Sequence, residues 1–167
     1  MRRVAESPGL TIVSGGQTGV DRGALDAALE AGVACGGWCP AGRRAEDGVI
    51  PDRYPLTELP GGGYAERTRR NVEDSDGTAV LTDGPATGGT RLTMEACAEA
   101  GKPLLCVDRA MTPEDAARRL AAFARAHGIR RLNVAGPRAS EAPGVERWAR
   151  AVIGAVIRAL LAPRGDG

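Results

Sequence analysis

The chain has 167 residues, a length that fits one domain with a single hydrophobic core. Its 22 basic and 21 acidic side chains nearly cancel, so no overall charge draws the protein onto nucleic acid or an anionic membrane. Hydrophobic residues make up 43% but aromatic residues only 3%, so we expect a core of Ala, Val, Leu and Ile. No run of about 18 apolar residues suits a membrane span, and we expect neither a membrane nor a nucleic-acid partner.

The start of the chain bears on localisation. Residues 1–9 carry Arg2 and Arg3 and lack the apolar run of a signal peptide, so we expect a cytoplasmic protein. We expect a short tail at 1–9, one domain at 10–162 and a second short tail at 163–167.

The cysteines bear on disulfides and metals. Cys35, Cys97 and Cys106 lie in apolar or helical contexts that are typical of reduced, buried thiols. Cys35 and Cys39 have a C-x3-C spacing, but the chain has one histidine, His127, and no second cysteine pair at ligand spacing. We therefore expect no protein-bound metal.

The first part of the chain alternates short apolar runs with glycine-rich turns and helical patterns. A strand is expected at 10–13, followed by a turn at 14–19 and a helix that ends at Gly32. A second strand is expected at 33–35. Residues 36–60 are rich in Gly, Pro, Arg and Asp and are too long for a linker, which indicates a functional loop.

The same alternation continues to the end of the chain. The predicted elements are a helix at 64–73, a strand at 78–82, a helix at 90–100, a strand at 103–107, a helix at 112–128, a strand at 131–134 and a helix with an apolar face at 145–160. Five strands interleaved with helices predict a Rossmann-like, doubly wound α/β domain. Its sheet should be mainly parallel, with helices on both faces.

Three glycine-rich turns follow predicted strands, at the edge where doubly wound sheets bind their ligands. Backbone amides without side chains, at the positive end of a helix, attract phosphate. The residues expected to contact the ligand are Ser14, Gly15, Gly16, Gln17, Thr18 and Gly19 in the first turn, Gly88, Gly89 and Thr90 in the second, and Asn133, Gly136 and Arg138 in the third. Neither a Walker A loop nor a G-x-G-x-x-G fingerprint is present, so ATP hydrolysis is not predicted. Together the turns predict a phosphate or pyrophosphate site.

Polar side chains between these turns extend the predicted site. Arginine is suited to clamp an anion, and Arg22, Arg43 and Arg67 are candidates together with Asn71. For Arg43 and Arg44, a solvated charged surface is an equally good interpretation.

Six segments, in order along the chain, carry a resemblance to a known family. They are Ser14–Arg22, Gly37–Gly48, Arg67–Val72, Asp74–Thr78, Gly88–Thr90 and Leu132–Arg138. Together they resemble the putative molybdenum cofactor carrier family, the YpsA-related branch of the SLOG superfamily, over residues 10–160. The resemblance implies a Rossmann-like homo-oligomer, a dimer or tetramer. It also implies that the glycine turns hold a nucleotide or the phosphate of molybdenum cofactor (molybdopterin), with the metal on the cofactor's dithiolene.

The same superfamily contains LOG-type phosphoribohydrolases, which this chain resembles only in part. Their pattern is P-G-G-x-G-T-x-x-E, with the glutamate three positions after the threonine. Here Glu95 is five positions after Thr90, and Pro85 is separated from Gly88 by two residues. This departure weakens the case for Glu95 as a catalytic acid or base.

Three functional hypotheses follow. The first is a carrier or sensor that binds a phosphorylated pterin or nucleotide without a chemical step. The second is an N-glycosidic hydrolase acting on nucleoside monophosphates, in which Arg67 or Arg70 orients the phosphate and Glu95 or Asp47 stabilises the oxocarbenium-like state. The third is an interaction module with a vestigial pocket.

Overall fold

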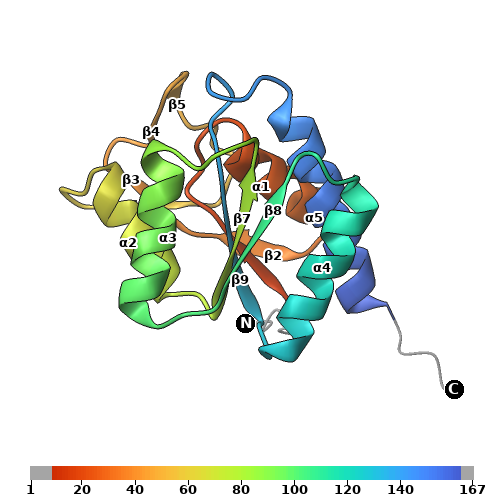
Figure 1. Ribbon diagram of the computed structural model, residues 1–167. Coiled ribbons are helices and arrows are strands. Elements are labelled where there is room, and N and C mark those ends of the chain that lie inside the picture. Colours follow the sequence, from red (N-terminus) through yellow and green to blue (C-terminus); the bar gives the residue numbers. More distant parts are fainter. Residues whose placement is uncertain (1–8, 163–167) are drawn as a thin grey trace, which may run out of the picture.

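Five parallel strands form the central sheet of the computed structural model, which describes residues 9–162 (Figure 1). They are β1 (Thr11–Val13), β2 (Ala34–Gly36), β7 (Gly77–Thr82), β8 (Leu104–Asp108) and β9 (Arg131–Ala135). The five strands predicted from the sequence are confirmed, each to within a residue at either end. The tails expected at 1–9 and 163–167 lie outside the described residues, except for Gly9.

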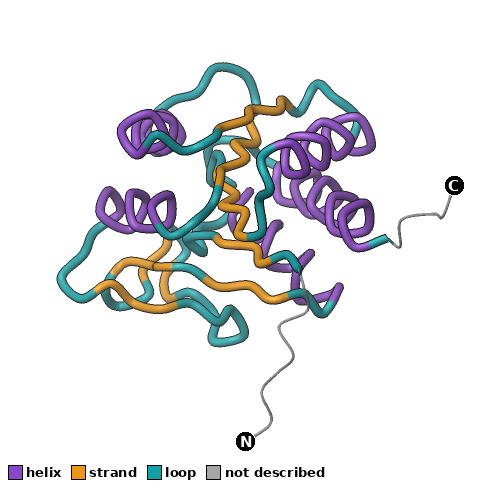
Figure 2. The backbone as a smooth tube through the Cα atoms, turned by 90° about the horizontal axis from the view of Figure 1, so that it is seen from below, coloured by secondary structure: helices purple, strands orange, loops and turns teal. Residues whose placement is uncertain are grey.

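Helices cover both faces of this sheet, which Figure 2 shows between two helical layers. On one face α1 (Val20–Ala31) packs against α5 (Val145–Leu161), and α5 also contacts α4 (Pro113–Ala126). On the other face α2 (Tyr64–Glu73) packs against α3 (Gly88–Ala100). The Rossmann-like, doubly wound class predicted from the sequence is therefore confirmed.

Local signals place the helix ends. Helix α1 is followed by Gly32 in the left-handed conformation, with φ of 67°, as the sequence predicts. The Thr112 hydroxyl caps α4 by accepting a hydrogen bond from the amide of Asp115 at 3.2 Å, and Pro113 is the first helical residue.

The strand order shows how the chain is wound. It is β2-β1-β9-β7-β8, so the last strand in the sequence lies at the centre of the sheet. If β9 and α5 preceded β1, the order would be 3-2-1-4-5, as in the dinucleotide-binding Rossmann sheet. Gly9 and Leu10 border the same hollow as Leu160 and Leu161, so the two ends of the described chain lie near each other. The domain is thus a circular permutation of that arrangement.

The segment expected to be a long loop contains four short strands. β3 (Trp38–Pro40) pairs in parallel with β6 (Thr57–Leu59), and β4 (Arg44–Ala45) pairs antiparallel with β5 (Gly48–Val49). A small hydrophobic cluster supports them: Leu25, Cys39, Ala45, Ile50 and Tyr54. Strands of two or three residues are too short for an alternating pattern to reveal them.

All four cysteines are free thiols, and Cys97 is buried as expected. Cys106 is exposed, contrary to expectation, because it lies on β8 at the edge of the sheet.

Within residues 9–162, no helix combines the length and the apolar character needed to cross a membrane.

Candidate functional site

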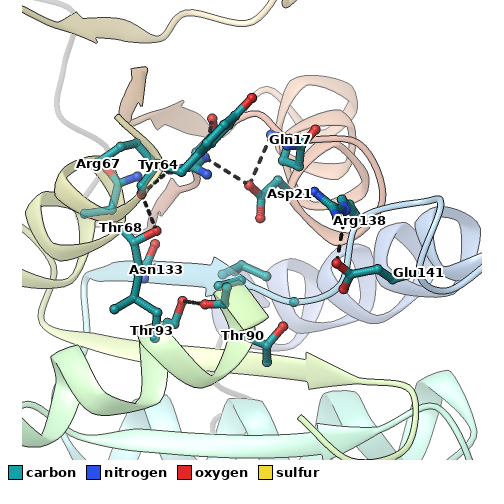
Figure 3. A pocket seen from close by; sticks show the side chains of 17 residues that line it. Gln17, Asp21, Tyr64, Arg67, Thr68, Thr90, Thr93, Asn133, Arg138 and Glu141 are labelled. Carbon is teal, nitrogen blue, oxygen red and sulfur yellow. Dashed lines mark hydrogen bonds and ion pairs between the residues drawn. The ribbon is translucent and has the colours of Figure 1, made fainter. Parts of the chain in front are cut away.

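A cavity of about 220 Å³ opens at the carboxyl ends of β1 and β9, between α1 on one face of the sheet and α2 and α3 on the other (Figure 3). Predicted residues from all three glycine-rich turns and from α2 line it: Gly15, Gln17, Arg67, Asn71, Gly89, Thr90, Asn133, Gly136 and Arg138. Tyr64, Thr68, Leu92, Thr93 and Glu141 also line it and were not predicted. The three turns therefore meet at one cavity, as the strand-end argument requires.

The second turn leaves the N-terminus of α3 open. The side chain of Thr87, at the N-cap, makes no capping hydrogen bond, and the first turn has no acidic residue. Within residues 9–162 the amides of Gly88 and Gly89 have no hydrogen-bond acceptor. A Cβ built on Gly89 would meet no atom within 4 Å. Unpaired amides at the positive end of a helix form an anion-binding site.

The first turn, in contrast, uses the amides of Gly16, Gln17 and Thr18 internally. The amide of Gln17 donates to Asp21 Oδ2 at 3.1 Å, and the amide of Thr18 donates to Gln17 Oε1 at 3.0 Å. The Ser14 hydroxyl donates to the Asp21 carbonyl and accepts from the Gly16 amide. Of the predicted residues in this turn, Gly15 and Gln17 line the cavity, whereas Ser14, Gly16, Thr18 and Gly19 do not.

Two glycines of this turn allow other parts of the chain to approach, rather than a ligand. Gly16 has φ of 79°, and a Cβ there would lie 2.3 Å from Leu56 Cδ1. Gly19 has φ of 82°, and a Cβ there would lie 2.4 Å from the Pro137 carbonyl oxygen. Both positions need glycine for packing and backbone conformation.

Two arginines predicted to bind the anion are used elsewhere. Arg22 donates to the Gly16 carbonyl at 3.1 Å and forms a bidentate ion pair with Asp47 at 2.5 and 2.7 Å. Arg43 donates to four backbone carbonyls, those of Ile50, Pro51, Tyr54 and Leu56, at 2.9 to 3.3 Å. Neither arginine lines the cavity. A guanidinium satisfies carbonyls and phosphates with the same donors, so the sequence alone does not distinguish these uses.

Asn71 lines the cavity, but its side-chain amide holds β3 in place. Asn71 Oδ1 accepts from the backbone amide of Trp38 at 2.7 Å, and Asn71 Nδ2 donates to the backbone carbonyl of Trp38 at 3.0 Å. Arg70 lies over the Trp38 ring at 4.9 Å and is not part of the cavity lining.

The third turn is tied to the first through Glu46. Its carboxylate accepts from the Thr18 hydroxyl, from the Ser140 amide at 3.1 Å and from the Ser140 hydroxyl at 2.5 Å. These hydrogen bonds hold the pKa of Glu46 below its usual value. Arg138 pairs with Glu141 at 3.0 Å and approaches Glu46 at 3.4 Å.

Gly136, also in the third turn, is a packing residue at the rim of the cavity. A Cβ there would lie 2.2 Å from the Leu81 carbonyl oxygen and 2.7 Å from Val20 Cγ2. The glycine therefore lets the turn lie directly on β7 and α1.

Asp21 and Arg67 form the charged centre of the cavity, and each is only 8% exposed. Arg67 Nη1 donates to the Gly15 carbonyl at 2.9 Å and lies 3.6 Å from Asp21 Oδ2. Burial raises the pKa of Asp21 to about 6, although Arg67, the Gln17 amide and Arg22 act in the opposite direction. Asp21 was not among the ligand-binding residues predicted from the sequence. Its position in the first helical turn after the glycines was the available signal.

Four polar atoms in this lining remain free to bind a ligand. Asp21 Oδ1, Arg67 Nη2, Thr90 Oγ1 and Asn133 Oδ1 have no hydrogen-bond partner among residues 9–162, and each side chain is less than 9% exposed. No fully buried side-chain nitrogen or oxygen in the described chain lacks a partner. These four atoms therefore retain some accessible surface, and all four residues line the cavity.

The acidic residues considered for hydrolysis lie away from this centre, whereas Arg67 belongs to it. Glu95 is exposed on α3, and Asp47 is exposed in its pair with Arg22. Neither lines the cavity. Three positions after Thr90, where the LOG-type pattern has glutamate, this chain has Thr93, whose hydroxyl donates to the Gly89 carbonyl at 3.1 Å.

In the described part of the chain, no group of three or more His, Cys, Asp or Glu side chains is placed to hold a metal ion.

The strand order defines a permuted Rossmann-like domain with a cavity at the carboxyl edge of its sheet. The chain belongs to the circularly permutated YpsA SLOG family, whose sequence model matches residues 12–157. It is 40% identical to a putative molybdenum carrier protein from Syntrophus aciditrophicus SB, known from a crystal structure at 1.45 Å resolution. That match covers 90% of this chain and 96% of the other, with a TM-score of 0.86. Among curated proteins, none matches the chain. The family predicted from the sequence motifs is thus confirmed.

Proposed function

We propose that the protein is a carrier that binds a phosphorylated nucleotide-like or pterin ligand in this cavity. The observation that carries the proposal is the uncapped N-terminus of α3, where the amides of Gly88 and Gly89 are free and Gly89, unlike Gly88, lines the cavity that also contains the buried Arg67. A phosphate there would accept hydrogen bonds from these amides and from Arg67 Nη2. The cavity is smaller than the roughly 300 Å³ of the smallest typical ligand pockets, so it encloses only part of a nucleotide-sized molecule.

Molybdenum cofactor fits this arrangement through its phosphate. The α3 amides and Arg67 would hold the phosphate, and Thr90 Oγ1 is a further free polar atom beside them. The cofactor's own dithiolene would retain the metal, and the chain would contribute binding and orientation. The structural relative described as a putative molybdenum carrier protein favours this ligand.

The test begins with mass spectrometry of any small molecule that copurifies with the native protein. Calorimetry then measures binding of that molecule, or of AMP and GMP, to the wild type and to Gly89→Leu. Because a Cβ at Gly89 would meet no protein atom within 4 Å, we expect an intact fold with at least about tenfold weaker binding. Ala98→Leu, on the exposed surface of the same helix, is the matched control. Equal affinity in both variants would show that the phosphate does not bind at α3.

A second candidate function is N-glycosidic hydrolysis, and Asp21 is the observation that favours it. A buried carboxylate with a raised pKa in a cavity suits a general acid or base, whereas Glu95 and Asp47 lie elsewhere. The reaction would add water across the bond between base and ribose, giving ribose 5-phosphate and the free base. Incubation with AMP, GMP and CMP, followed by chromatography, detects it. Protein-dependent base release that Asp21→Asn abolishes would replace the carrier proposal.

The remaining expectations stay predictions. The interaction-module hypothesis predicts no thermal shift with any nucleotide or pterin, since a ligand that binds only the native state raises the melting temperature. Light scattering measures the expected dimer or tetramer. Cell fractionation tests the cytoplasmic location, and a gel-shift experiment tests the expected lack of nucleic-acid binding.

A further inference from the structure

Strand β8, at one edge of the central sheet, carries a row of outward-facing backbone groups. In the described chain, β7 is the only strand that pairs with β8. The Thr78 amide donates to the Pro103 carbonyl at 3.0 Å, and the Arg109 amide donates to the Thr82 carbonyl at 2.8 Å. The direction of the backbone groups alternates from one residue to the next along a strand. The residues of β8 whose backbone groups point away from β7 are therefore Leu104, Cys106 and Asp108.

No other part of the described chain satisfies these outward groups. Among residues 9–162, the amides of Leu104, Cys106 and Asp108 have no acceptor, and the carbonyls of Leu104 and Cys106 have no donor. Figure 1 shows β8 as the strand nearest the viewer, between α3 and α4, with no other element in front of it. Cys106, in the middle of the strand, is exposed. The edge is therefore open to a further strand.

β8 also lacks the features with which proteins usually block an exposed edge. Residues 104–108 contain neither lysine nor proline, and their register with β7 runs without a bulge from Thr78 and Leu104 to Thr82 and Asp108. The opposite edge is different, because β2 has only three residues. β8 is thus the edge of this sheet that is suited to pairing with another chain.

We propose that β8 pairs antiparallel with β8 of a second copy of this chain and so joins the two sheets into one. This interaction goes beyond ligand binding and does not depend on it. Antiparallel pairing of identical strands has a twofold axis, so the assembly closes after two chains. Pro103 precedes the strand, and a turn ends it, in which the Asp108 carbonyl accepts from the Met111 amide at 2.9 Å. Full overlap of the two strands therefore places the axis at the middle residue, Cys106.

The residue pairs formed in this register are compatible with each other. Cys106 lies opposite Cys106 of the second copy as a hydrogen-bonded pair, and Leu104 lies opposite Asp108. Asp108 is the only charged residue of β8, so no like charges face each other within the paired strands. The two Cys106 Cα atoms would be about 5.5 Å apart, a separation that a disulfide can span. This self-complementarity favours a second copy over a strand from a different protein.

Sedimentation velocity of the full chain tests the proposal. We expect a wild-type dimer, or a tetramer in which β8 forms one of two interfaces. Cys106→Lys places two ammonium groups opposite each other, and Cys106→Pro removes the central outward amides, so each change should halve the mass. Neither change removes a hydrogen bond to β7, because the amide of Cys106 points away from that strand.

Two control variants should keep the wild-type mass. Cys106→Val retains the outward amide and adds no charge. Ala34→Lys adds the same charge as Cys106→Lys at an exposed position of β2, the strand at the opposite edge of the sheet. Circular dichroism of each variant shows whether it is folded.

A cross-link tests the register. Of the four cysteines, Cys106 is the one that is exposed, so oxidation with copper phenanthroline should join two wild-type chains by a disulfide that Cys106→Ser abolishes. A monomeric wild type overturns the proposal, even if the edge accepts a strand of another protein. An oligomer that keeps its mass in a folded Cys106→Lys overturns it too, because the interface then lies elsewhere. An oligomer without the Cys106 cross-link overturns the proposed register. The wild-type mass and cross-link decide the question even if both disruptive variants fail to fold.

Discussion

The ionisation of Asp21 predicts an unusual pH dependence of stability. Its pKa is raised from 3.8 to about 6 in the native state, so the native protein binds a proton more tightly than the unfolded chain does. Stability is therefore highest at acidic pH with respect to this group, and it decreases as pH rises from about 4 to about 6. A shift of about two units corresponds to about 3 kcal/mol at neutral pH. Asparagine cannot ionise, so Asp21→Asn should be more stable than the wild type by up to that amount at pH 7, but not at pH 4.

Urea unfolding between pH 4 and pH 8, followed by circular dichroism, measures this difference. Asp47→Asn is the matched control of opposite sign. Its partner Arg22 holds the pKa of Asp47 below the usual value, so Asp47 stabilises the fold above its unfolded pKa, and its loss should lower stability at neutral pH. An Asp21→Asn variant that is less stable than the wild type at pH 7, or whose advantage does not change with pH, would refute the argument from burial.

Three further substitutions test the fold by urea unfolding. Gly136→Ala places a methyl group 2.2 Å from the Leu81 carbonyl oxygen and should cost about 1–3 kcal/mol; a neutral effect would mean that the turn relaxes freely. Arg43→Lys keeps the charge but loses the fork that serves four carbonyls, and should cost about 1–3 kcal/mol and speed proteolysis within 36–60. Gly32→Ala, at φ of 67° in open space, should cost only about 1 kcal/mol.

Features of the fold that depend on neighbours in the sequence could be predicted. Gly32 ends α1 and Thr112 begins α4, because caps act within a few residues. The five strands were recognisable because each has a short apolar run next to a turn. The strands within 36–60 were missed, since β4 and β5 have two residues each and depend on a cluster that includes Leu25 of α1.

The location of the site could be predicted from the sequence, but which of its polar groups are free to bind a ligand could not. The strand-end rule brought Gly15, Gly89 and Asn133 to one cavity, because parallel strands end at a common edge. Which polar groups remain free depends on partners that are distant in sequence. Arg43 is bound by carbonyls of the 50–56 segment, and Thr18 is bound by Glu46. The free oxygen of Asp21 appears only once these pairings are known.

The central position of β9 has a consequence for how the protein is made. β1 and β7 do not pair with each other, because β9 lies between them and pairs with both. Thr11 of β1 lies opposite Arg131 of β9, and Gly77 of β7 lies opposite Leu132. Until β9 has emerged from the ribosome, the pair of β1 and β2 is not joined to the pair of β7 and β8, and both pairs have exposed edges. The sheet can therefore be completed only late in synthesis, after the C-terminal third of the chain has emerged, and the edges that β9 will cover stay unpaired until then.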